Sequence, residues 1–445
     1  MVFPMKASGP QAGKYIDFLR QLDPVPVFGK VTKVIGLTVE AEGPDANIGD
    51  VCLIHPPKSD KPLKAEVVGF RGNKVILMPL GDLHSIGPGC DVVSTGKPLS
   101  VQVGYELLGK VLDGLGQPLD GSLLPLRMSQ YSTNNSPGNP LMRPRVLHPI
   151  SVGIRCIDGL LTIGKGQRVG IFAGSGVGKS TLMGMIARNT SADVNVIALV
   201  GERGREVLDF IERDLGPEGL AKSVVVVATS DQPALIRIKG ALIATSIAEY
   251  FRDKGLDVML MMDSVTRYAM AQREVGLAIG EPPATRGYTP SVFANLPKLL
   301  ERSGTGPKGS ITAFYTVLVD GDDMNEPIAD AVRGILDGHI VLDRHLANKG
   351  HYPAIDVLAS VSRVMKEIVP PEQQEAADFL KKLLSVYRSS EDLINLGAYQ
   401  SGTNPEIDLS LQFISKIHEF TTQKTDEKVS YEETVQRLIG EFHKG

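Results

Sequence analysis

The chain has few cysteines and no long apolar run. Its 445 residues include three cysteines, Cys52, Cys90 and Cys156, which are far apart and form no C-x-x-C pair. We therefore expect neither a disulfide framework nor a zinc site, and a reducing cytoplasm is the simplest setting. No stretch approaches the roughly 18 uninterrupted apolar residues of a membrane-spanning helix, and the amino terminus lacks the apolar core of a signal peptide. Any association with a membrane is expected to depend on a partner.

The chain also lacks an excess of positive charge. It has 47 Lys and Arg against 51 Asp and Glu, a net charge of −4, and it shows no basic–aromatic stripe. This balance gives no electrostatic reason to expect nucleic acid as a partner. With 42% hydrophobic and 22% charged residues, the composition is that of an ordinary soluble protein with enough residues for several domains.

The first 25 residues differ in pattern from the rest of the chain. Within residues 1–25, apolar side chains recur at helical spacing, at Tyr15, Phe18, Leu19 and Leu22. One interpretation is a helix packed on its own domain. The other is an amino-terminal arm that docks a partner, since terminal segments are often untethered.

Three further regions are indicated by changes in the hydrophobic pattern. Residues 26–98 contain short β runs separated by Gly and Pro, the first over 29–40, which is typical of a small barrel or sandwich. Within residues 99–369, a loop-like stretch precedes near-continuous apolar runs that alternate with helical periodicity, which predicts an α/β core with a parallel sheet covered on both faces. Residues 370–445 begin at a proline pair and are predicted to form a carboxy-terminal helical domain.

Residues 173–181 carry the strongest local signal for function and read Ala-Gly-Ser-Gly-Val-Gly-Lys-Ser-Thr. They follow a predicted strand and precede a predicted helix, as a phosphate-binding loop requires. Glycines let backbone N–H groups turn toward phosphates, and the helix start adds partial positive charge. Ala173 stands where the consensus begins with Gly and is small enough to be tolerated. We expect ATP to be bound by Gly174, Ser175, Gly176, Val177, Gly178, Lys179, Ser180 and Thr181.

Within this loop two side chains have specific expected roles. Lys179 would reach the β- and γ-phosphates, and the Ser180 hydroxyl would ligate Mg²⁺. The alternative, a glycine-rich turn that matches by chance, is disfavoured by the flanking strand and helix.

Two acidic residues lie where strands are expected to end, and a third, Glu206, follows shortly after one of them. Asp263 closes the apolar run 258–262, and Glu202 directly follows the run 196–200. Because α/β folds bind ligands at the carboxyl ends of parallel strands, we expect Asp263 to hold Mg²⁺ through water and Glu202 to orient and polarise the attacking water. Glu206 is expected to assist around the metal-bound water. The alternatives are an Asp263 that caps the next helix and an acidic–basic cluster that forms a capped, solvated turn.

These motifs together resemble the catalytic subunits of the rotary and type III secretion ATPases. Residues 353–363 read Pro-Ala-Ile-Asp-Val-Leu-Ala-Ser-Val-Ser-Arg and look like the hallmark segment of that superfamily. Other matching motifs lie in the superfamily's order: the phosphate loop, residues 201–206, 231–233 and 248–253, and Asp263. Four stretches are most similar to the flagellar type III export ATPase: residues 172–189, 201–216, 262–289 and 320–344. The resemblance covers the chain from about residue 25.

The resemblance implies a fold and an assembly. It implies an amino-terminal β-barrel, a RecA-like ATPase core and a carboxy-terminal helical domain. It also implies a homohexamer in the cytoplasm, peripherally associated with the inner-membrane export apparatus, that hydrolyses ATP to drive or unfold export substrates and release chaperones. The implied partners are a central-stalk-like export protein, the export gate membrane protein, and a stator-like regulator at the amino-terminal arm.

The resemblance also implies roles for individual residues. Glu202 falls where the family keeps its water-activating glutamate, and Arg363 falls where a neighbour's arginine reaches the γ-phosphate. A guanidinium supplied in trans would neutralise charge on the transferred phosphoryl group. Tyr352 falls where the family stacks an aromatic ring on adenine. Taken alone, Arg363 is more typical of a surface or ion-paired arginine, and Tyr352 is also compatible with ordinary packing.

Four alternative functions compete with flagellar export. The virulence injectisome ATPase is the same machine with other cargo. The catalytic subunit of a rotary proton-translocating ATPase works beside non-catalytic subunits, whereas this chain carries both the catalytic set and Arg363, which suits a homo-oligomer. A non-enzymatic ring subunit is disfavoured by the intact set of Lys179, Ser180, Glu202 and Asp263. An RNA-translocating helicase is disfavoured by the acidic net charge.

Overall fold

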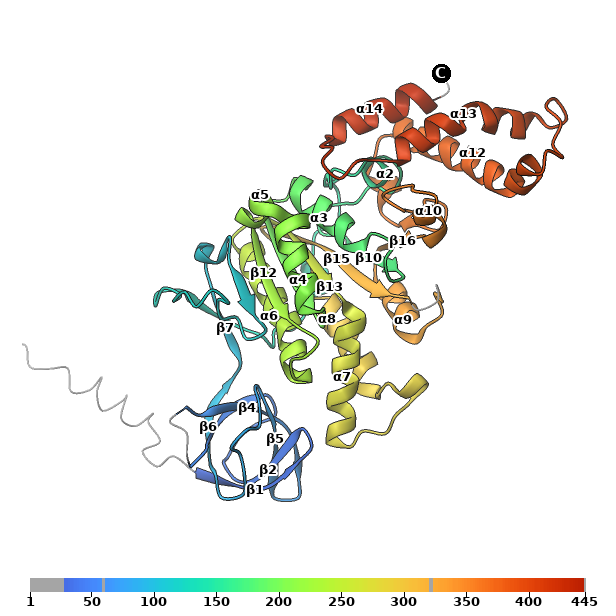
Figure 1. Cartoon of the computed structure of the whole chain (residues 1–445). Coiled ribbons are helices and arrows are strands. Elements are labelled where there is room, and N and C mark those ends of the chain that lie inside the picture. The colour runs from blue at the N-terminus through green and yellow to red at the C-terminus, as the bar shows by residue number, and fades with distance from the viewer. Residues whose placement is uncertain (1–27, 58–60, 320–322, 444–445) are drawn as a thin grey trace, which may run out of the picture. The chain divides into compact units, whose positions relative to one another are not determined.

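The computed structural model describes residues 28–57, 61–319 and 323–443. The predicted amino-terminal arm, residues 1–25, lies outside the described residues. The described chain divides after Pro98 into two compact units (Figure 1).

The amino-terminal unit is a closed antiparallel barrel. Its described strands pair in the order β1-β2-β5-β4-β3-β6. They are β1 (Phe28–Ile35), β2 (Thr38–Glu42), β3 (Asp50–His55), β4 (Leu63–Arg71), β5 (Lys74–Pro79) and β6 (Asp91–Pro98). Inward-facing side chains such as Val39, Ile54 and Leu77 are fully buried and form the core. The β run 29–40 was predicted as one strand and is two, because Gly36 at a φ of 55° turns the chain between β1 and β2.

The second unit is built on a mostly parallel sheet. Its described strands follow the order β17-β16-β10-β15-β13-β11-β12-β8, with β14 paired on β15. The strands are β8 (Val111–Asp113), β10 (Arg168–Ala173), β11 (Val194–Val200), β12 (Ser223–Ala228), β13 (Asp257–Asp263), β14 (Gly304–Thr305), β15 (Ser310–Leu318), β16 (Gly338–Leu342) and β17 (Val361–Ser362). Only β14 and β17 pair antiparallel within this described sheet. A separate two-stranded antiparallel sheet pairs β7 (Ser100–Val103) with β9 (Ser129–Ser132).

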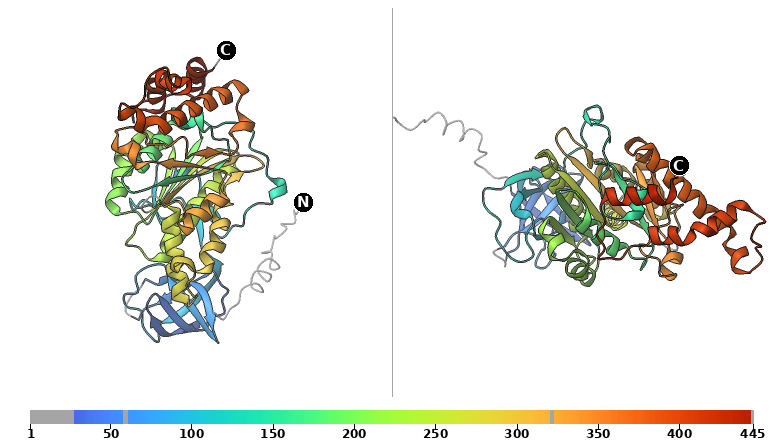
Figure 2. Two further views of the ribbon diagram at one scale, coloured as in Figure 1. Left: turned by 90° about the vertical axis from the view of Figure 1, so that its right-hand side faces the viewer. Right: turned by 90° about the horizontal axis from the view of Figure 1, so that it is seen from above.

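Helices cover both faces of this sheet, as predicted from the continuous apolar runs (Figure 2). Met259 and Met261 face a core that includes α2 (Arg155–Leu160) and α3 (Lys179–Asn189). The alternate residue Leu260 is also fully buried, because α6 (Ala234–Asp253) packs on the other face. The remaining helical segments of this region are η1 (Tyr105–Leu107), η2 (Pro140–Met142), α4 (Gly204–Asp209), η3 (Phe210–Leu215), α5 (Gly216–Ala221), α7 (Val265–Ile279), η4 (Thr285–Gly287), α8 (Pro290–Leu300), α9 (Pro327–Ile335), α10 (Arg344–Asn348) and α11 (Met365–Ile368).

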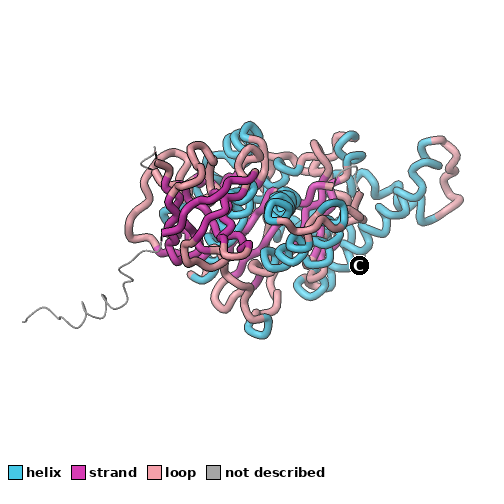
Figure 3. Tube along the Cα trace, turned by 90° about the horizontal axis from the view of Figure 1, so that it is seen from below, coloured by secondary structure: helices cyan, strands magenta, loops and turns pink. Residues whose placement is uncertain are grey.

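The carboxy-terminal region is helical, as predicted (Figure 3). It consists of α12 (Pro371–Asn395), α13 (Pro405–Thr421) and α14 (Tyr431–Phe442). Helix α13 begins earlier than its apolar periodicity predicted, because the Asn404 side chain caps it and Pro405 occupies its first turn. Phe420 and Phe442 from these helices join the same core as α2 and α3. No helix among the described residues has both the length and the apolar character needed to cross a membrane.

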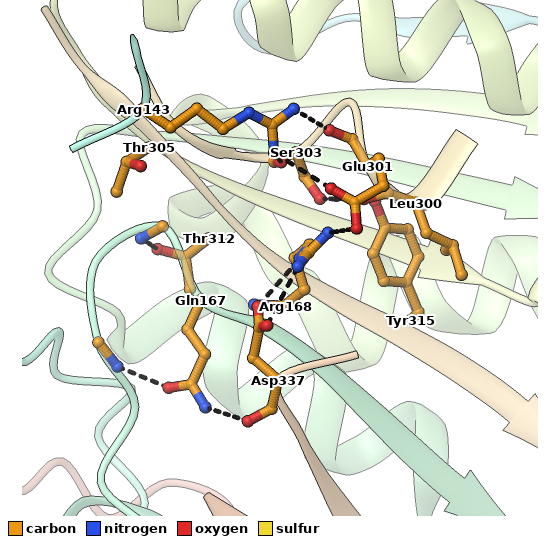
Figure 4. Close-up of polar contacts among 12 residues, drawn as sticks. Arg143, Gln167, Arg168, Leu300, Glu301, Ser303, Thr305, Thr312, Tyr315 and Asp337 are labelled. Atoms are coloured by element: carbon orange, nitrogen blue, oxygen red, sulfur yellow. Dashed lines mark hydrogen bonds and ion pairs between the residues drawn. The ribbon is translucent and has the colours of Figure 1, made fainter. Parts of the chain in front are cut away.

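A polar cluster lies where β10 and β16 begin (Figure 4). Arg168 forms an ion pair with Asp337 (Nε to Oδ2, 2.9 Å) and another with Glu301. Arg143 also pairs with Glu301 (Nη1 to Oε2, 3.3 Å), which ties the segment before α2 to the sheet. A pocket lined by Arg143, Arg168 and Asp337 opens here, next to Val364. It therefore lies at the amino ends of the parallel strands, away from the phosphate loop.

Candidate active site

The phosphate loop connects the carboxyl end of β10 with α3. Gly176 and Gly178 have φ values of 77° and 91°, a left-handed conformation that glycine adopts without strain. Gly178 immediately precedes Lys179, the first residue of α3, and no side chain caps this helix start. The first N–H groups of α3 and the loop around them thus have the geometry of an anion-binding helix terminus.

The predicted loop residues fall into two groups. Gly174 and Val177 are buried and hold the loop against the core, whereas Ser175, Gly176 and Ser180 are exposed. Thr181, by contrast, is half-buried and its side chain hydrogen-bonds to Asp214. Thr181 is therefore held by the protein, while Ser180 presents a free face to a ligand.

Lys179 lies between two of the predicted carboxylates. Its Nζ is 2.5 Å from Asp263 Oδ1 and 3.7 Å from Glu202 Oε1. Glu202 and Asp263 come from the carboxyl ends of adjacent strands, β11 and β13, and Lys179 from the helix after β10. All three side chains are largely buried, at 12%, 15% and 5% exposure for Lys179, Glu202 and Asp263. The structure thus brings together three residues that are up to 84 positions apart in sequence.

The environment of Glu202 raises its pKa to about 7. Burial is the largest cause, and the negative charge of Asp263 adds to it, while Lys179 opposes the shift. A hydrogen bond with Glu206 raises the pKa further. A carboxylate with a pKa near 7 can accept a proton from water and release it again near neutral pH.

The oxygen ligands around Asp263 fit magnesium. Asp263 is 3% exposed at the end of β13, and Thr316 donates a hydrogen bond to its Oδ1 (2.7 Å), which leaves Oδ2 without a hydrogen bond to a described residue. No cluster of three or more metal-ligating His, Cys, Asp or Glu side chains occurs among the described residues. A sparse set of one hydroxyl and one carboxylate suits Mg²⁺, which keeps several waters and takes the rest of its ligands from phosphates. Glu206 is about half exposed and pairs weakly with Arg203 (3.7 Å), so it is placed at the rim beside Glu202.

Tyr352 lies against the phosphate loop. A Cβ built on Gly178 would be 3.6 Å from the Cδ1 and Cε1 atoms of the Tyr352 ring, so a side chain at Gly178 would touch the ring. The Tyr352 side chain is 44% exposed, and its ring is therefore open to a ligand on one side. This position is compatible with an aromatic ring that stacks on a nucleotide base.

Arg363 is not part of this cluster. Its backbone N–H donates to Asp337 O (3.1 Å), and Asp337 N–H donates to Arg168 O (2.9 Å), at the first residue of β10. The phosphate loop begins after the last residue of β10, about 17 Å away along the strand. Arg363 is exposed, and its Nη2 donates only a long bond to Arg333 O (3.4 Å) among the described residues. Within one chain, Arg363 and Lys179 are at opposite ends of the sheet.

Two residues of the site were missed by the sequence analysis. Thr316 on β15 orients Asp263, and Arg267 on α7 packs against Gly201, where an added Cβ would come within 2.8 Å of the Arg267 Cβ. The Arg267 Nε is buried and has no hydrogen-bond partner among the described residues. The sequence signal that could have indicated the Arg267 contact is Gly201, the glycine before Glu202. It has a φ of 73°, and a glycine at such a position often marks the close approach of another segment.

The activity of the cluster should depend on pH. Since Glu202 acts as a base only when deprotonated, we expect kcat/KM for ATP hydrolysis to rise with pH through about 7. Glu206→Gln removes a group that raises this pKa, so it should shift the midpoint to lower pH. The measurement is the pH profile of kcat/KM for both proteins under saturating magnesium. A flat profile between about pH 6 and pH 8 would contradict the role of Glu202 as base.

The fold and the cluster define the chain as a P-loop ATPase with a RecA-like core. The family models agree along the chain. The ATP synthase alpha/beta family, nucleotide-binding domain, matches residues 153–362, and its beta-barrel domain matches residues 31–96. The T3SS EscN ATPase C-terminal domain matches residues 369–440. The chain belongs to the ATP synthase alpha/beta family, within the branch of flagellar and type III secretion ATPases.

Individual relatives and solved structures support this branch. The chain is 62% identical over 424 residues to the "Flagellum-specific ATP synthase" of Bacillus subtilis (strain 168), covering 95% of this chain and 97% of that protein. It is 51% identical to the "Type 3 secretion system ATPase" of Xanthomonas euvesicatoria, covering 92% and 93%. The structure of the assembled ATPase EscN from enteropathogenic E. coli superposes with a TM-score of 0.87 at 48% identity, over 93% of this chain and 99% of that chain. EscN has also been solved in complex with its central stalk EscO, with a TM-score of 0.86. The predicted resemblance, fold class and ATPase activity are confirmed.

Proposed function

We propose that the chain hydrolyses Mg-ATP as one subunit of a homohexameric ring that energises the export of flagellar proteins through a type III export gate. The observation that carries the ATPase chemistry is the placement of Lys179 between Glu202 and Asp263 at the end of the phosphate loop. The flagellar assignment is supported by the 62% and 54% identity to proteins named flagellum-specific ATP synthase. The virulence injectisome is the nearest alternative, because secretion ATPases are 51% and 52% identical to this chain and so lie close behind the flagellar relatives.

Each residue of the cluster has a distinct part in the proposed reaction. The N–H groups of the loop and Lys179 hold the β- and γ-phosphates. Ser180 and Asp263 would hold Mg²⁺, which neutralises phosphate charge when bound. Glu202 accepts a hydrogen bond from the attacking water and polarises it, and its raised pKa suits it to take the proton. Tyr352 stacks on the adenine base.

Arg363 completes the site of a neighbouring subunit in this proposal. Because it lies about 17 Å from the phosphate loop of its own chain, it cannot reach that chain's γ-phosphate. An exposed guanidinium at the β17 edge is free to reach across a seam between subunits and stabilise the charge on the transferred phosphoryl group. Ring assembly is supported by the likeness to the assembled EscN.

The remaining partners are proposed by the same analogy. A central-stalk-like export protein is supported by the EscN–EscO complex. We further propose the export gate membrane protein, export substrates with their chaperones, and a stator-like regulator bound by the amino-terminal arm. The proposed location is the cytoplasm, at the inner-membrane export apparatus, and the proposed division of the chain is an arm (1–25), a barrel (26–98), an ATPase domain (99–369) and a helical domain (370–445).

Flagellin export tests the physiological role. Deletion of the gene for this chain should abolish motility and flagellin secretion, and expression of the wild-type chain should restore both. Lys179→Ala should fail to restore either, because the phosphates lose their main cation. A deletion strain that stays motile but loses secretion of other effector proteins would instead establish the injectisome role.

A further inference from the structure

Gln423 is a buried amide whose hydrogen-bonding groups are all used. It follows α13, at the start of the segment that leads to α14, and it is 4% exposed. Its Oε1 accepts from Arg155 N–H (2.8 Å), and its Nε2 donates to Gly153 O (2.9 Å) and Glu427 O (3.0 Å). A buried amide with every bond made is costly to replace and fixes the segments it joins.

The side-chain contacts fix Gln423 against the nucleotide-binding region. Arg155 is the first residue of α2, whose N-cap residue supplies no side-chain bond, so the Gln423 amide provides an acceptor at that helix start. Gly153 has a φ of 69°, and an added Cβ there would lie 2.4 Å from the Asn189 Cβ at the end of α3. Gln423 is therefore bonded to a segment that packs directly on the helix of the phosphate loop.

The backbone of the same residue holds Tyr352. Gln423 N–H donates to Tyr352 O (2.9 Å), and the preceding Thr422 Oγ1 lies within hydrogen-bond distance of His351 Nδ1 (3.3 Å). Because the Tyr352 ring is nearly half exposed, burial alone does not fix its orientation. The first contact ties the Tyr352 backbone, and the second ties the preceding residue His351, to the end of α13, while the Tyr352 ring lies against Gly178 of the phosphate loop.

We propose that Gln423 is a positioning residue for the nucleotide base, acting through Tyr352. Its side chain anchors its own backbone, and that backbone holds Tyr352 so that the ring faces the base above the phosphate loop. This inference rests on the proposed stacking of Tyr352 on adenine. The additional inference is that the segment between α13 and α14 affects the affinity for the base of the nucleotide and not the affinity for its phosphates.

Gln423→Leu tests the inference, because leucine keeps the volume and removes the three side-chain hydrogen bonds. We expect KM for ATP to rise by about tenfold, the loss typical of one base–aromatic stack, while kcat is nearly unchanged. Binding of inorganic tripolyphosphate, which has no base, should stay the same. Gln412→Leu, on the exposed side of α13, is the matched control and should change neither value. If Gln423→Leu does not fold, Gln423→Glu keeps the acceptor for Arg155 N–H and removes the donor.

Tyr352→Ala separates failure of this inference from failure of the proposed base site. If Tyr352→Ala leaves ATP affinity unchanged, the base site itself is wrong and the inference falls with it. If Tyr352→Ala weakens ATP binding but Gln423→Leu does not, the base site stands and the role of Gln423 is refuted. The double variant should be no weaker than Tyr352→Ala alone, because both changes remove the same stack. Fully additive losses, or an equal loss of tripolyphosphate binding, would overturn the inference.

Discussion

Glu202→Gln is expected to leave ATP binding largely intact and to lower the hydrolysis rate by roughly 10²–10⁴-fold. Glutamine has nearly the same shape, so the contacts of the loop and of Lys179 with the phosphates remain. It cannot take a proton from water, however, and the base that Glu202 supplies at a pKa of about 7 is lost. The measurement is single-turnover ATP hydrolysis beside equilibrium binding of a fluorescent ATP analogue.

The neighbouring acid provides the control for Glu202. Glu206 is about half exposed and contacts the Glu202 carboxyl, so Glu206→Gln makes the same chemical change at the rim of the cluster. It should lower the rate far less than Glu202→Gln. Unchanged turnover in Glu202→Gln, or an equal loss in both variants, would refute the assigned role of Glu202.

Arg363→Ala is expected to lower the ATPase rate by roughly 10³-fold with little effect on the unfolding temperature. The side chain is exposed and makes only one long hydrogen bond to a described residue, so its loss should cost the fold little. Its loss should remove the cation that stabilises the transferred phosphoryl group of the adjacent subunit. Lys366→Ala, an exposed cation three residues further along, is the matched control and should keep nearly full activity.

Mixing two inactive variants gives the sharper test of a shared site. Lys179→Ala subunits lack the phosphate-binding lysine but keep Arg363. Arg363→Ala subunits keep Lys179 but lack the arginine. In a mixed ring, some seams join the intact Lys179 of an Arg363→Ala subunit to the intact Arg363 of a Lys179→Ala subunit. These seams hold a complete site, so part of the activity should return. A wild-type rate that rises steeply with protein concentration would agree with this result. No recovery in mixed rings, or full activity of an isolated Arg363→Ala monomer, would exclude catalysis in trans.

The parts of the fold set by local pattern were predictable from the sequence. The runs at β11 and β13 are apolar at nearly every position, which only a sheet covered on both faces satisfies, and the phosphate loop is marked by its glycines and its Lys-Ser-Thr ending. The split of run 29–40 was not predicted, because both strands have β-type sequences and a single glycine, Gly36, reverses the chain between them. The part of α13 before residue 411 was missed because the start of this helix is set by a cap rather than by periodicity.

The site shows the same division between local and distant contacts. Lys179, Glu202 and Asp263 each follow a recognisable strand, so their convergence could be expected from the geometry of a parallel sheet. Thr316 and Gln423 carry no local signal, since each acts through a partner more than 50 residues away. Such contacts result from tertiary packing and are visible only once the fold is known.

The separation of Lys179 and Arg363 across the sheet has a consequence for the number of working sites. In the proposed arrangement each subunit would contribute one half of a site at either end of its sheet, so a complete site would exist only where two subunits meet. An open oligomer of n subunits would then hold n − 1 complete sites. The terminal subunit at one end would have an unused Arg363, and the terminal subunit at the other end an unused Lys179. Ring closure brings these two terminal subunits together and completes one further site. The ATPase activity per subunit should therefore increase at ring closure, without any change in the structure of the other subunits.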